Sequence, residues 1–281
     1  MTTPSRRLWL PGIFRRMSAT GRSDLQLSVV IPVCNEAGNV ATLASEISTA
    51  LDGRLHFEVL FVDDGSSDAT AAEVLKVRDG SSSPIRLLQH DKCIGQSAGI
   101  RTGVLAAKAP WIATLDGDGQ NDPADIPLLI EALQDYDADG KLKLVMGNRT
   151  TRRDTLLRRF SSRVANAVRS TVLHDGTPDT GCGIKLFERD MFLQLPHFNH
   201  MHRFLPALVQ RAGHRVISVP VNHRPRMRGA SKYGVGNRLW VGIVDLFGVM
   251  WLIRRRIVPL TATEEHLSHQ AGSPFREQRT M

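Results

Sequence analysis

The sequence predicts a single α/β domain in which helices cover both faces of a mostly parallel sheet. Apolar, β-rich runs alternate with helical stretches from residue 27 onward. The spacing between successive runs leaves room for the right-handed helical crossovers that join parallel strands. The chain has 281 residues, which is enough for one large domain with an appendage. Hydrophobic residues make up 42% and charged residues 23%, proportions that are ordinary for a globular protein.

Each element follows from a local pattern. Runs rich in apolar and β-branched residues are expected as strands at 27–33, 57–62, 85–88, 111–115, 142–147 and 214–221. Helices are expected at 40–51, 68–78, 95–107, 123–134, 155–173 and 236–256. The last stretch, from about residue 260, is polar and is expected to be disordered.

The bulk composition narrows the class of partner. The net charge of +8 and the pI of about 9.9 indicate an anionic partner, such as nucleic acid, a membrane surface or a phosphorylated substrate. Aromatic residues make up only 6% and interleave with no basic run, which argues against binding nucleic acid by base stacking. Three cysteines without metal-type spacing favour a reduced, cytoplasmic chain. No apolar run reaches the roughly 20 residues of a spanning helix, and the N-terminus lacks the apolar core of a secretory signal.

Two carboxylates, Asp116 and Asp118, follow the apolar run 111–115, and Gln120 comes two residues later. Oxygen-bearing side chains at alternate positions suit one Mg²⁺ or Mn²⁺, which leaves its other positions to water and substrate phosphates. Open α/β sheets bind their ligands at this end of the strands. An acidic turn also follows a strand by chance often enough that the pair alone is weak support for a metal site.

Polar residues also follow the first two strands. Pro32 closes the first strand, and Asn35 and Glu36 then either face the cleft or help to cap the next helix. Asp63 and Asp64 close the second strand, where carboxylates can accept hydrogen bonds from a nucleotide base or from ribose hydroxyls.

A glycine-punctuated turn follows the third strand. Its backbone N–H groups could meet a phosphate at the start of the next helix. Close packing of that helix on the sheet is the preferred role for most of its glycines, Gly95, Gly99 and Gly103.

Two basic segments are candidates for anion binding. The first begins with Arg149, and its Arg159 and Arg163 lie at i and i+4, on one side of the expected helix. A solvated charged face is the alternative for this segment. The second runs from Arg224 to Lys232 and has the character of a loop that closes over a diphosphate and neutralises it.

Taken together, these motifs resemble the family 2 glycosyltransferases and, within them, the polyprenyl-phosphate branch that is similar to dolichyl-phosphate mannose synthase. The resemblance covers about residues 27–235, and five motifs in the right order make it specific. The matching pieces are Pro32…Asn35-Glu36, Asp63-Asp-Gly-Ser-Ser-Asp68, Asp116-Gly-Asp-Gly-Gln120, Asp179-Thr-Gly-Cys-Gly183 and Arg226-Met-Arg-Gly-Ala-Ser-Lys232. It implies a Rossmann-like domain of the glycosyltransferase A type that binds a nucleotide-diphosphate sugar across the ends of the first, second and fourth strands.

The resemblance also implies roles for individual residues. The donor-binding set is Pro32, Asn35, Glu36, Asp63, Asp64, Asp116, Arg226 and Ser231. The metal set is Asp116, Asp118 and Gln120, and the catalytic set is Asp118, Arg149, Arg163, Asp179 and Lys232. Arg149 and Arg163 would face a lipid phosphate, and Lys232 the leaving nucleoside diphosphate.

The implied reaction is inverting transfer of a sugar to a polyprenyl phosphate. Asp179 would act as a base only if the acceptor were a hydroxyl of a soluble glycan, which is the alternative left open. A metal-dependent nucleotidyltransferase is a less favoured alternative. Such an enzyme usually has a glycine-rich loop with a basic residue directly after the first strand, and this sequence has no such loop there.

On this interpretation the chain has a basic N-terminal segment (1–24), a catalytic domain (25–235), an interfacial amphipathic helix (236–258) and a polar tail (259–281). A lipid acceptor favours peripheral attachment to the cytoplasmic face of the membrane. The apolar side of the last helix would lie in the interface, with Arg254–Arg256 near anionic headgroups. The alternatives are that this helix packs on the sheet or on a second copy of the chain in a homo-oligomer.

Overall fold

The computed structural model describes residues 25–149, 169–173, 175–225 and 235–255. Within these residues the strands are β1 (Leu27–Val33), β2 (Phe57–Asp63), β3 (Ile85–Gln89), β4 (Trp111–Thr114), β5 (Leu142–Arg149), β6 (Lys185–Glu188) and β7 (Arg215–Val221). The α-helices are α2 (Ala37–Leu51), α3 (Thr70–Asp79), α4 (Gln96–Ala106), α5 (Ile126–Tyr136), α7 (Arg189–Gln194), α8 (Leu205–Arg211) and α9 (Val235–Arg254). Two 3₁₀ turns are η2 (Pro123–Asp125) and η3 (Met201–Arg203).

All the described strands join one sheet, in the spatial order β3-β2-β1-β4-β6-β5-β7. Neighbouring strands are parallel except at β6, which runs antiparallel to both β4 and β5. Strand β1 lies inside the sheet, where Leu27 pairs with Phe57 of β2 on one side and with Trp111 of β4 on the other. The predicted fold class, a mostly parallel sheet, is confirmed.

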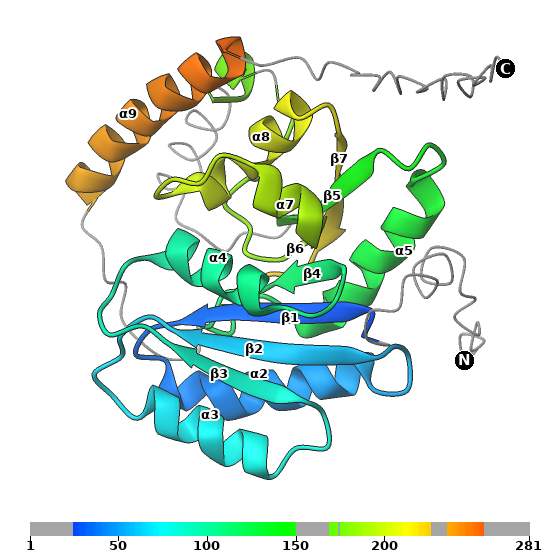
Figure 1. Ribbon diagram of the computed structural model, residues 1–281, viewed down its shortest axis with the longest axis vertical. Coiled ribbons are helices and arrows are strands. Elements are labelled where there is room, and N and C mark those ends of the chain that lie inside the picture. The colour runs from blue at the N-terminus through cyan, green and yellow to red at the C-terminus, as the bar shows by residue number, and fades with distance from the viewer. Residues whose placement is uncertain (1–24, 150–168, 174, 226–234, 256–281) are drawn as a thin grey trace, which may run out of the picture.

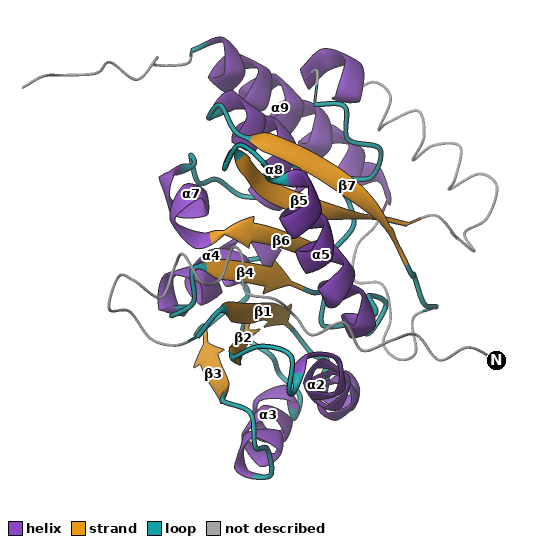
Figure 2. Ribbon diagram, turned by 90° about the vertical axis from the view of Figure 1, so that its right-hand side faces the viewer, coloured by secondary structure: helices purple, strands orange, loops and turns teal. Residues whose placement is uncertain are grey.

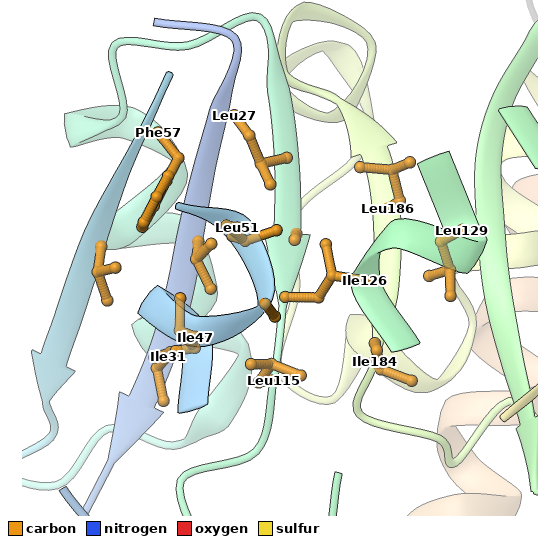
Figure 3. Close-up of a cluster of buried hydrophobic side chains, with 14 of the residues drawn as sticks. Leu27, Ile31, Ile47, Leu51, Phe57, Leu115, Ile126, Leu129, Ile184 and Leu186 are labelled. Atoms are coloured by element: carbon orange, nitrogen blue, oxygen red, sulfur yellow. The ribbon is translucent and has the colours of Figure 1, made fainter. Parts of the chain in front are cut away.

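Helices cover both faces of the sheet, as Figures 1 and 2 show. Helices α2, α3 and α5 pack on one face, and α4, α7 and α8 on the other. The buried positions of α2 recur at the spacing of a helical face, at Val40, Leu43, Ala44, Ile47 and Leu51. Figure 3 shows Ile47 and Leu51 of α2 beside Leu27 and Ile31 of β1. Ile126 and Leu129 of α5 extend the same cluster.

Two glycines let α4 lie directly against the sheet. A Cβ atom at Gly103 would lie 2.3 Å from Val30 Cγ1, and one at Gly99 would lie 3.0 Å from Pro32 Cβ. Close packing is thus confirmed for these two. Gly95 has a different task, because it precedes the helix with a φ of 114°, a conformation that side chains rarely adopt.

Helix α9 packs on the outer side of α8. Its Leu246, Val249 and Met250 join Phe204 and Ala207 in a small apolar cluster. The side chain of Arg211 caps its last turn by donating from Nε to the carbonyl of residue 252 at 2.7 Å. Among the described helices, none has the length and apolar character needed to cross a membrane.

The sequence pattern assigned no element between residues 174 and 213, where the structure has β6, α7 and α8. Strand β6 was missed because it is four residues long and carries a charge at each end, Lys185 and Glu188. The N-terminal segment 1–24, the polar tail 259–281 and most of the expected basic helix and basic loop lie outside the described residues. Residues 169–173, the end of that expected helix, are helical.

Candidate active site

One edge of the sheet gathers most of the polar motifs. Strands β1, β2, β4 and β5 all end there. Strand β6 begins at the same edge, because Lys185 pairs with Thr114, and β7 ends there, because Val221 pairs with Arg149. The segment that enters β6 and the segment that leaves β7 therefore border the turn after β4.

The turn after β4 carries the two predicted metal-binding carboxylates. Asp116 is half-buried, and its Oδ1 accepts a hydrogen bond from Gln96 Nε2 at 2.7 Å. Its backbone N–H donates to Asn121 Oδ1 at 3.0 Å. Asp118 Oδ1 accepts from the backbone N–H of Gln120 at 3.1 Å. These bonds hold both carboxylates on one short turn.

The chemistry of this turn fits a hard divalent cation. Burial raises the pKa of Asp116, the nearby charge of Asp118 raises it further, and Lys185 and Arg149 oppose the rise. A cation beside the two carboxylates would favour their ionised forms, and Mg²⁺ and Mn²⁺ prefer such oxygen ligands. The described residues contain no cluster of three or more His, Cys, Asp or Glu side chains able to hold a metal. A hard cation bound by two carboxylates takes its other ligands from water and substrate oxygens.

Gly183 lies against the same turn. A Cβ atom there would fall 2.2 Å from Asp116 Oδ2 and 2.4 Å from Asn121 Oδ1. Both distances are shorter than any real Cβ contact, so a side chain at this position would displace Asp116 and Asn121 from their present places. This contact explains why the motif that ends in Gly183 belongs to the site.

Arg149 and Asp179, predicted separately as catalytic residues, form one ion pair. Arg149 Nε lies 2.6 Å from Asp179 Oδ2 and Nη2 lies 2.8 Å from Oδ1, while the backbone N–H of Arg149 is 3.3 Å from Oδ2. Asp179 is 4% exposed. Burial acts to lower the pKa of Arg149, but the bonds to Asp179 raise it overall. Both oxygens of Asp179 are thus engaged in orienting a permanent cation.

Lys185 is a buried cation at this edge that the sequence analysis missed. Its ammonium group donates to the carbonyl of Cys182. Burial lowers its pKa, whereas the charges of Asp116 and Asp179 oppose that change. Ser97 Oγ lies 2.7 Å from His202 Nδ1. Burial lowers the pKa of His202 well below its usual value, and the charge of Lys185 acts in the same direction. A lysine within the apolar run 182–187 was the available signal.

The carboxylates after β2 both bond within the protein. Asp63 Oδ1 accepts from the backbone N–H of Ser66 at 3.0 Å. Asp64 lies 2.8 Å from His90 Nδ1 and accepts from the backbone N–H groups of Ile94 and Gly95 at 2.9 and 2.7 Å. Burial acts to raise the pKa of Asp64, but these hydrogen bonds lower it overall. Contact of either carboxylate with a nucleotide remains a prediction.

The residues after β1 join that strand to the turn after β2. Asn35 has a φ of 56°, and its Oδ1 accepts the backbone N–H of Ser67 at 2.7 Å. Glu36 directly precedes α2 but makes no side-chain cap, and its Oε2 accepts from Asn39 Nδ2 at 2.6 Å. Pro32 is half-buried within β1, where it meets α4. Asn35 therefore braces two strand ends against each other.

Four predicted site residues, Arg163, Arg226, Ser231 and Lys232, lie outside the described residues. The structure thus brings Asp116, Asp118, Gln120, Arg149 and Asp179 to one edge, with Asn35, Glu36, Asp63 and Asp64 at the ends of the two adjoining strands. Their roles toward substrate stay predictions.

Comparison with known proteins agrees with this arrangement. The chain is 34% identical over 240 residues to the dodecaprenyl-phosphate galacturonate synthase of Rhizobium johnstonii, which covers 84% of this chain and 70% of the relative. It is 32% identical over 211 residues to the undecaprenyl-phosphate 4-deoxy-4-formamido-L-arabinose transferase of Edwardsiella ictaluri. That match covers 74% of this chain and 63% of the relative, so the chain spans less than two thirds of the second protein.

A solved structure has the same fold. Glucosyl-3-phosphoglycerate synthase from Mycobacterium tuberculosis, in complex with Mn²⁺, uridine diphosphate and phosphoglyceric acid, superposes with a TM-score of 0.62. The two chains are 17% identical, and the match covers 92% of this chain and 86% of the other. The expected glycosyltransferase A-type fold is confirmed.

Residues 28–195 match the family described as "Glycosyl transferase family 2". They include the ends of β1, β2 and β4, the Arg149–Asp179 pair and the glycine that approaches Asp116. The resemblance drawn from the motifs is confirmed, and so is its polyprenyl-phosphate branch, to which the relatives' names point. This chain belongs to glycosyl transferase family 2 and is a glycosyltransferase.

Proposed function

We propose that this protein transfers a sugar, with inversion, from a nucleotide-diphosphate sugar to a polyprenyl phosphate. One observation carries the proposal: the Asp116–Asp118 turn and the guanidinium of Arg149, which Asp179 orients, lie at the same edge of the sheet. Two anionic substrates must approach each other, and this edge offers a site for a cation and a fixed guanidinium. The relatives act on dodecaprenyl and undecaprenyl phosphates, as their names state.

The chemistry requires no strong base in the protein. A polyprenyl phosphate is already largely ionised near neutral pH, because its second pKa is about 6. Its oxygen attacks the anomeric carbon while the bond from that carbon to the donor diphosphate breaks, and the electron pair leaves with the nucleoside diphosphate. In-line attack inverts the configuration at that carbon. Arg149, held by Asp179, would orient the acceptor phosphate through its guanidinium.

Asp116 and Asp118, with Gln120, would hold Mg²⁺ or Mn²⁺ on the turn after β4. When bound, the cation would neutralise the diphosphate and stabilise it as a leaving group. The protein's own part is to keep both carboxylates on the turn, through the hydrogen bonds of Gln96 and Asn121 and the absence of a side chain at Gly183.

The alternative acceptor, a glycan hydroxyl, would need Asp179 as its base. Asp179 is buried, and both of its oxygens bond to Arg149. A carboxylate held in this way is poorly placed to take a proton from a third group. The arrangement therefore favours the phosphate acceptor.

The outer face of α9 supports attachment to a membrane surface. One side of the helix packs on α8, while Ile243, Val244, Phe247 and Trp251 are exposed on the other, with Trp251 61% exposed. Arg254 and Arg255 are exposed at the end of the same helix. An apolar stripe that ends in cations suits a bilayer with anionic headgroups. One side of α9 can therefore pack on α8 while the other side lies on a membrane surface. In this proposal residues 236–258 form the membrane-facing part of the chain.

The test is a transfer assay with the purified protein, polyprenyl phosphate, Mn²⁺ or Mg²⁺ and a panel of radiolabelled nucleotide sugars. We expect label in the organic phase that disappears with a chelator and in Asp118→Ala. The matched control, Asp135→Ala, changes an exposed aspartate of α5 and should transfer like the wild type. Lack of transfer from every donor, with nucleotide binding intact, would overturn the lipid acceptor.

A further inference from the structure

The backbone of the segment that leaves β7 is joined to the predicted metal-binding turn and to η2, which follows it. The backbone N–H of Asn222 donates to Asp125 Oδ2 at 2.7 Å. His223 forms an antiparallel bridge with Asn121. One residue later, the backbone N–H of Arg224 donates to the carbonyl of residue 120 at 2.9 Å. The two segments, about 100 positions apart in the sequence, thus run side by side for three residues.

The side chain of Arg224 adds a second connection, which we call the Arg224 clasp (Glu46, Asp122 and Arg224). Its Nη1 lies 2.8 and 2.9 Å from the two carboxylate oxygens of Glu46 on α2. Its Nη2 lies 2.6 Å from Asp122 Oδ1. One guanidinium therefore ties the end of the turn, the exit of β7 and helix α2 together. The planar fork of arginine makes this possible, and lysine could not reproduce it.

The clasp lies next to the predicted metal ligands in the bonding network. Gln120, whose carbonyl accepts from Arg224, donates its own N–H to Asp118 Oδ1 at 3.1 Å. Asn121, between Gln120 and the clasped Asp122, accepts from the backbone N–H of Asp116 at 3.0 Å. The backbone of Asp116 and the carboxylate of Asp118 are thus each one hydrogen bond away from a residue that adjoins the clasp.

The turn needs such a restraint because its own structure resists the metal-binding arrangement. It brings two carboxylates together, so like charges push them apart, and it contains Gly117 and Gly119, which restrict the backbone little. Groups that hold ligands in place before a metal binds reduce the entropy lost on binding. The side chains of Arg224 and Glu46 are 30% and 33% exposed, so their ion pair contributes little to the stability of the whole fold.

We propose that Arg224 is a positioning residue, which holds the Asp116–Asp118 turn ready for the cation through Asp122 and the backbone of Gln120, with Glu46 fixing its guanidinium. The expected change in donor KM rests on the proposed function, whereas the restraint of the turn by Arg224 does not depend on it. It assigns Glu46, a residue of α2 outside the site motifs, an indirect part in donor binding.

The experiment compares Arg224→Gln, Arg224→Lys and Glu46→Gln with the wild-type chain. The matched control is Arg215→Gln, which breaks an exposed arginine pair with Asp139 at the opposite end of β7. Mn²⁺ binding is measured by electron paramagnetic resonance, with Mn²⁺ alone and with uridine diphosphate. Hydrogen exchange of residues 116–122 is measured without any ligand, and kcat and the donor KM follow from the transfer assay.

We expect Arg224→Gln to weaken Mn²⁺ binding by about tenfold or more, the usual effect of losing a group that supports metal ligands. The donor KM should rise by a similar factor while kcat changes less, and residues 116–122 should exchange faster. Arg224→Lys should behave almost as Arg224→Gln, Glu46→Gln should show a smaller change in the same direction, and Arg215→Gln should match the wild type.

Unchanged exchange of residues 116–122 in Arg224→Gln would overturn the proposal, whatever the activity. If the wild type bound no Mn²⁺, the metal part of the proposed function would fail, and hydrogen exchange alone would decide on the clasp. If no sugar reached a lipid but Mn²⁺ binding and exchange changed as expected, the clasp would stand and the acceptor would be wrong.

Discussion

Arg149 and Asp179 face each other through two nearly parallel contacts, from Nε to Oδ2 at 2.6 Å and from Nη2 to Oδ1 at 2.8 Å. The first residue ends β5 and the second precedes β6, so the pair spans the point where the parallel order of the sheet is interrupted. A guanidinium held at two points has little freedom to turn. Its remaining donors therefore keep one direction relative to the turn after β4.

Asp179→Asn should separate a positioning role from that of a base. Asparagine keeps one acceptor for Arg149 but loses the charge, so we expect kcat/KM to fall about 10- to 100-fold, mainly through a higher KM for the acceptor. The pH–rate profile should keep its shape, because no proton passes through Asp179. Loss of the acidic limb of that profile would show that Asp179 is the base.

Gly183→Ala should weaken metal binding at the Asp116–Asp118 turn, although it replaces none of the predicted metal ligands. The new methyl group would lie 2.2 Å from Asp116 Oδ2, so the carboxylate must move. We expect Mn²⁺ binding, measured by electron paramagnetic resonance, to weaken by at least about tenfold. Gly80→Ala is the control, because a Cβ there meets only backbone oxygens at 3.8 Å or more. Normal Mn²⁺ binding by Gly183→Ala would mean that Asp116 is not a ligand.

Asp64→Asn should lower stability in a pH-dependent way. The native pKa of Asp64 lies below its ordinary value, so ionised Asp64 stabilises the fold. We expect the free energy of unfolding of the wild type to exceed that of Asp64→Asn by about 1 to 3 kcal/mol, the contribution of hydrogen bonds to a charged group. The full difference is present above the unfolded pKa of about 3.9. It is lost as the pH falls through the lower native pKa.

Urea unfolding at pH 7, 5 and 3 measures this difference, with the exposed Asp190→Asn as the control. A difference between the wild type and Asp64→Asn that stayed constant down to pH 3 would contradict the explanation by charge.

Glu58→Ala should destabilise the fold far from the site. Glu58 is 1% exposed and accepts from Ser28 Oγ at 2.7 Å, the backbone N–H of Lys108 at 2.7 Å and Arg86 Nη1 at 2.8 Å. Losing it leaves buried donors without an acceptor, at a cost of about 3 kcal/mol in the free energy of unfolding. Breaking the exposed Arg78–Asp79 pair with Arg78→Ala should change that free energy by less than about 1 kcal/mol. Equal effects of the two substitutions in urea unfolding would refute the prediction.

Charges on the outer face of α9 should detach the protein from lipid. We expect Phe247→Asp/Trp251→Asp to reduce binding to phosphatidylglycerol vesicles at least tenfold, since two apolar side chains no longer enter the interface. Tyr136→Asp, at an exposed aromatic residue of α5, is the control. Sedimentation with vesicles at low and high salt separates the apolar contribution from that of Arg254 and Arg255. Equal sedimentation of both variants would rule out α9 as the contact.

Most of the fold could be predicted from local sequence patterns. The apolar run of β1 and the helical spacing of Val40, Leu43 and Ile47 depend only on near neighbours in the chain. Strand β6 could not be found in this way, since four residues with a charge at each end carry no clear period. It joins the sheet because β4 and β5 already supply a hydrogen-bonding partner on each side.

The sequence by itself determined the strand–helix alternation, the carboxylates at the strand ends and the family, because each depends on short motifs in a fixed order. Only the tertiary structure decided which polar groups meet. Asp179 engages Arg149, Lys185 lies buried near Asp116, and Arg224 joins Glu46 to Asp122. These partners come from segments far apart in the chain. They are brought together by the spatial order of the strands, which short-range patterns do not encode.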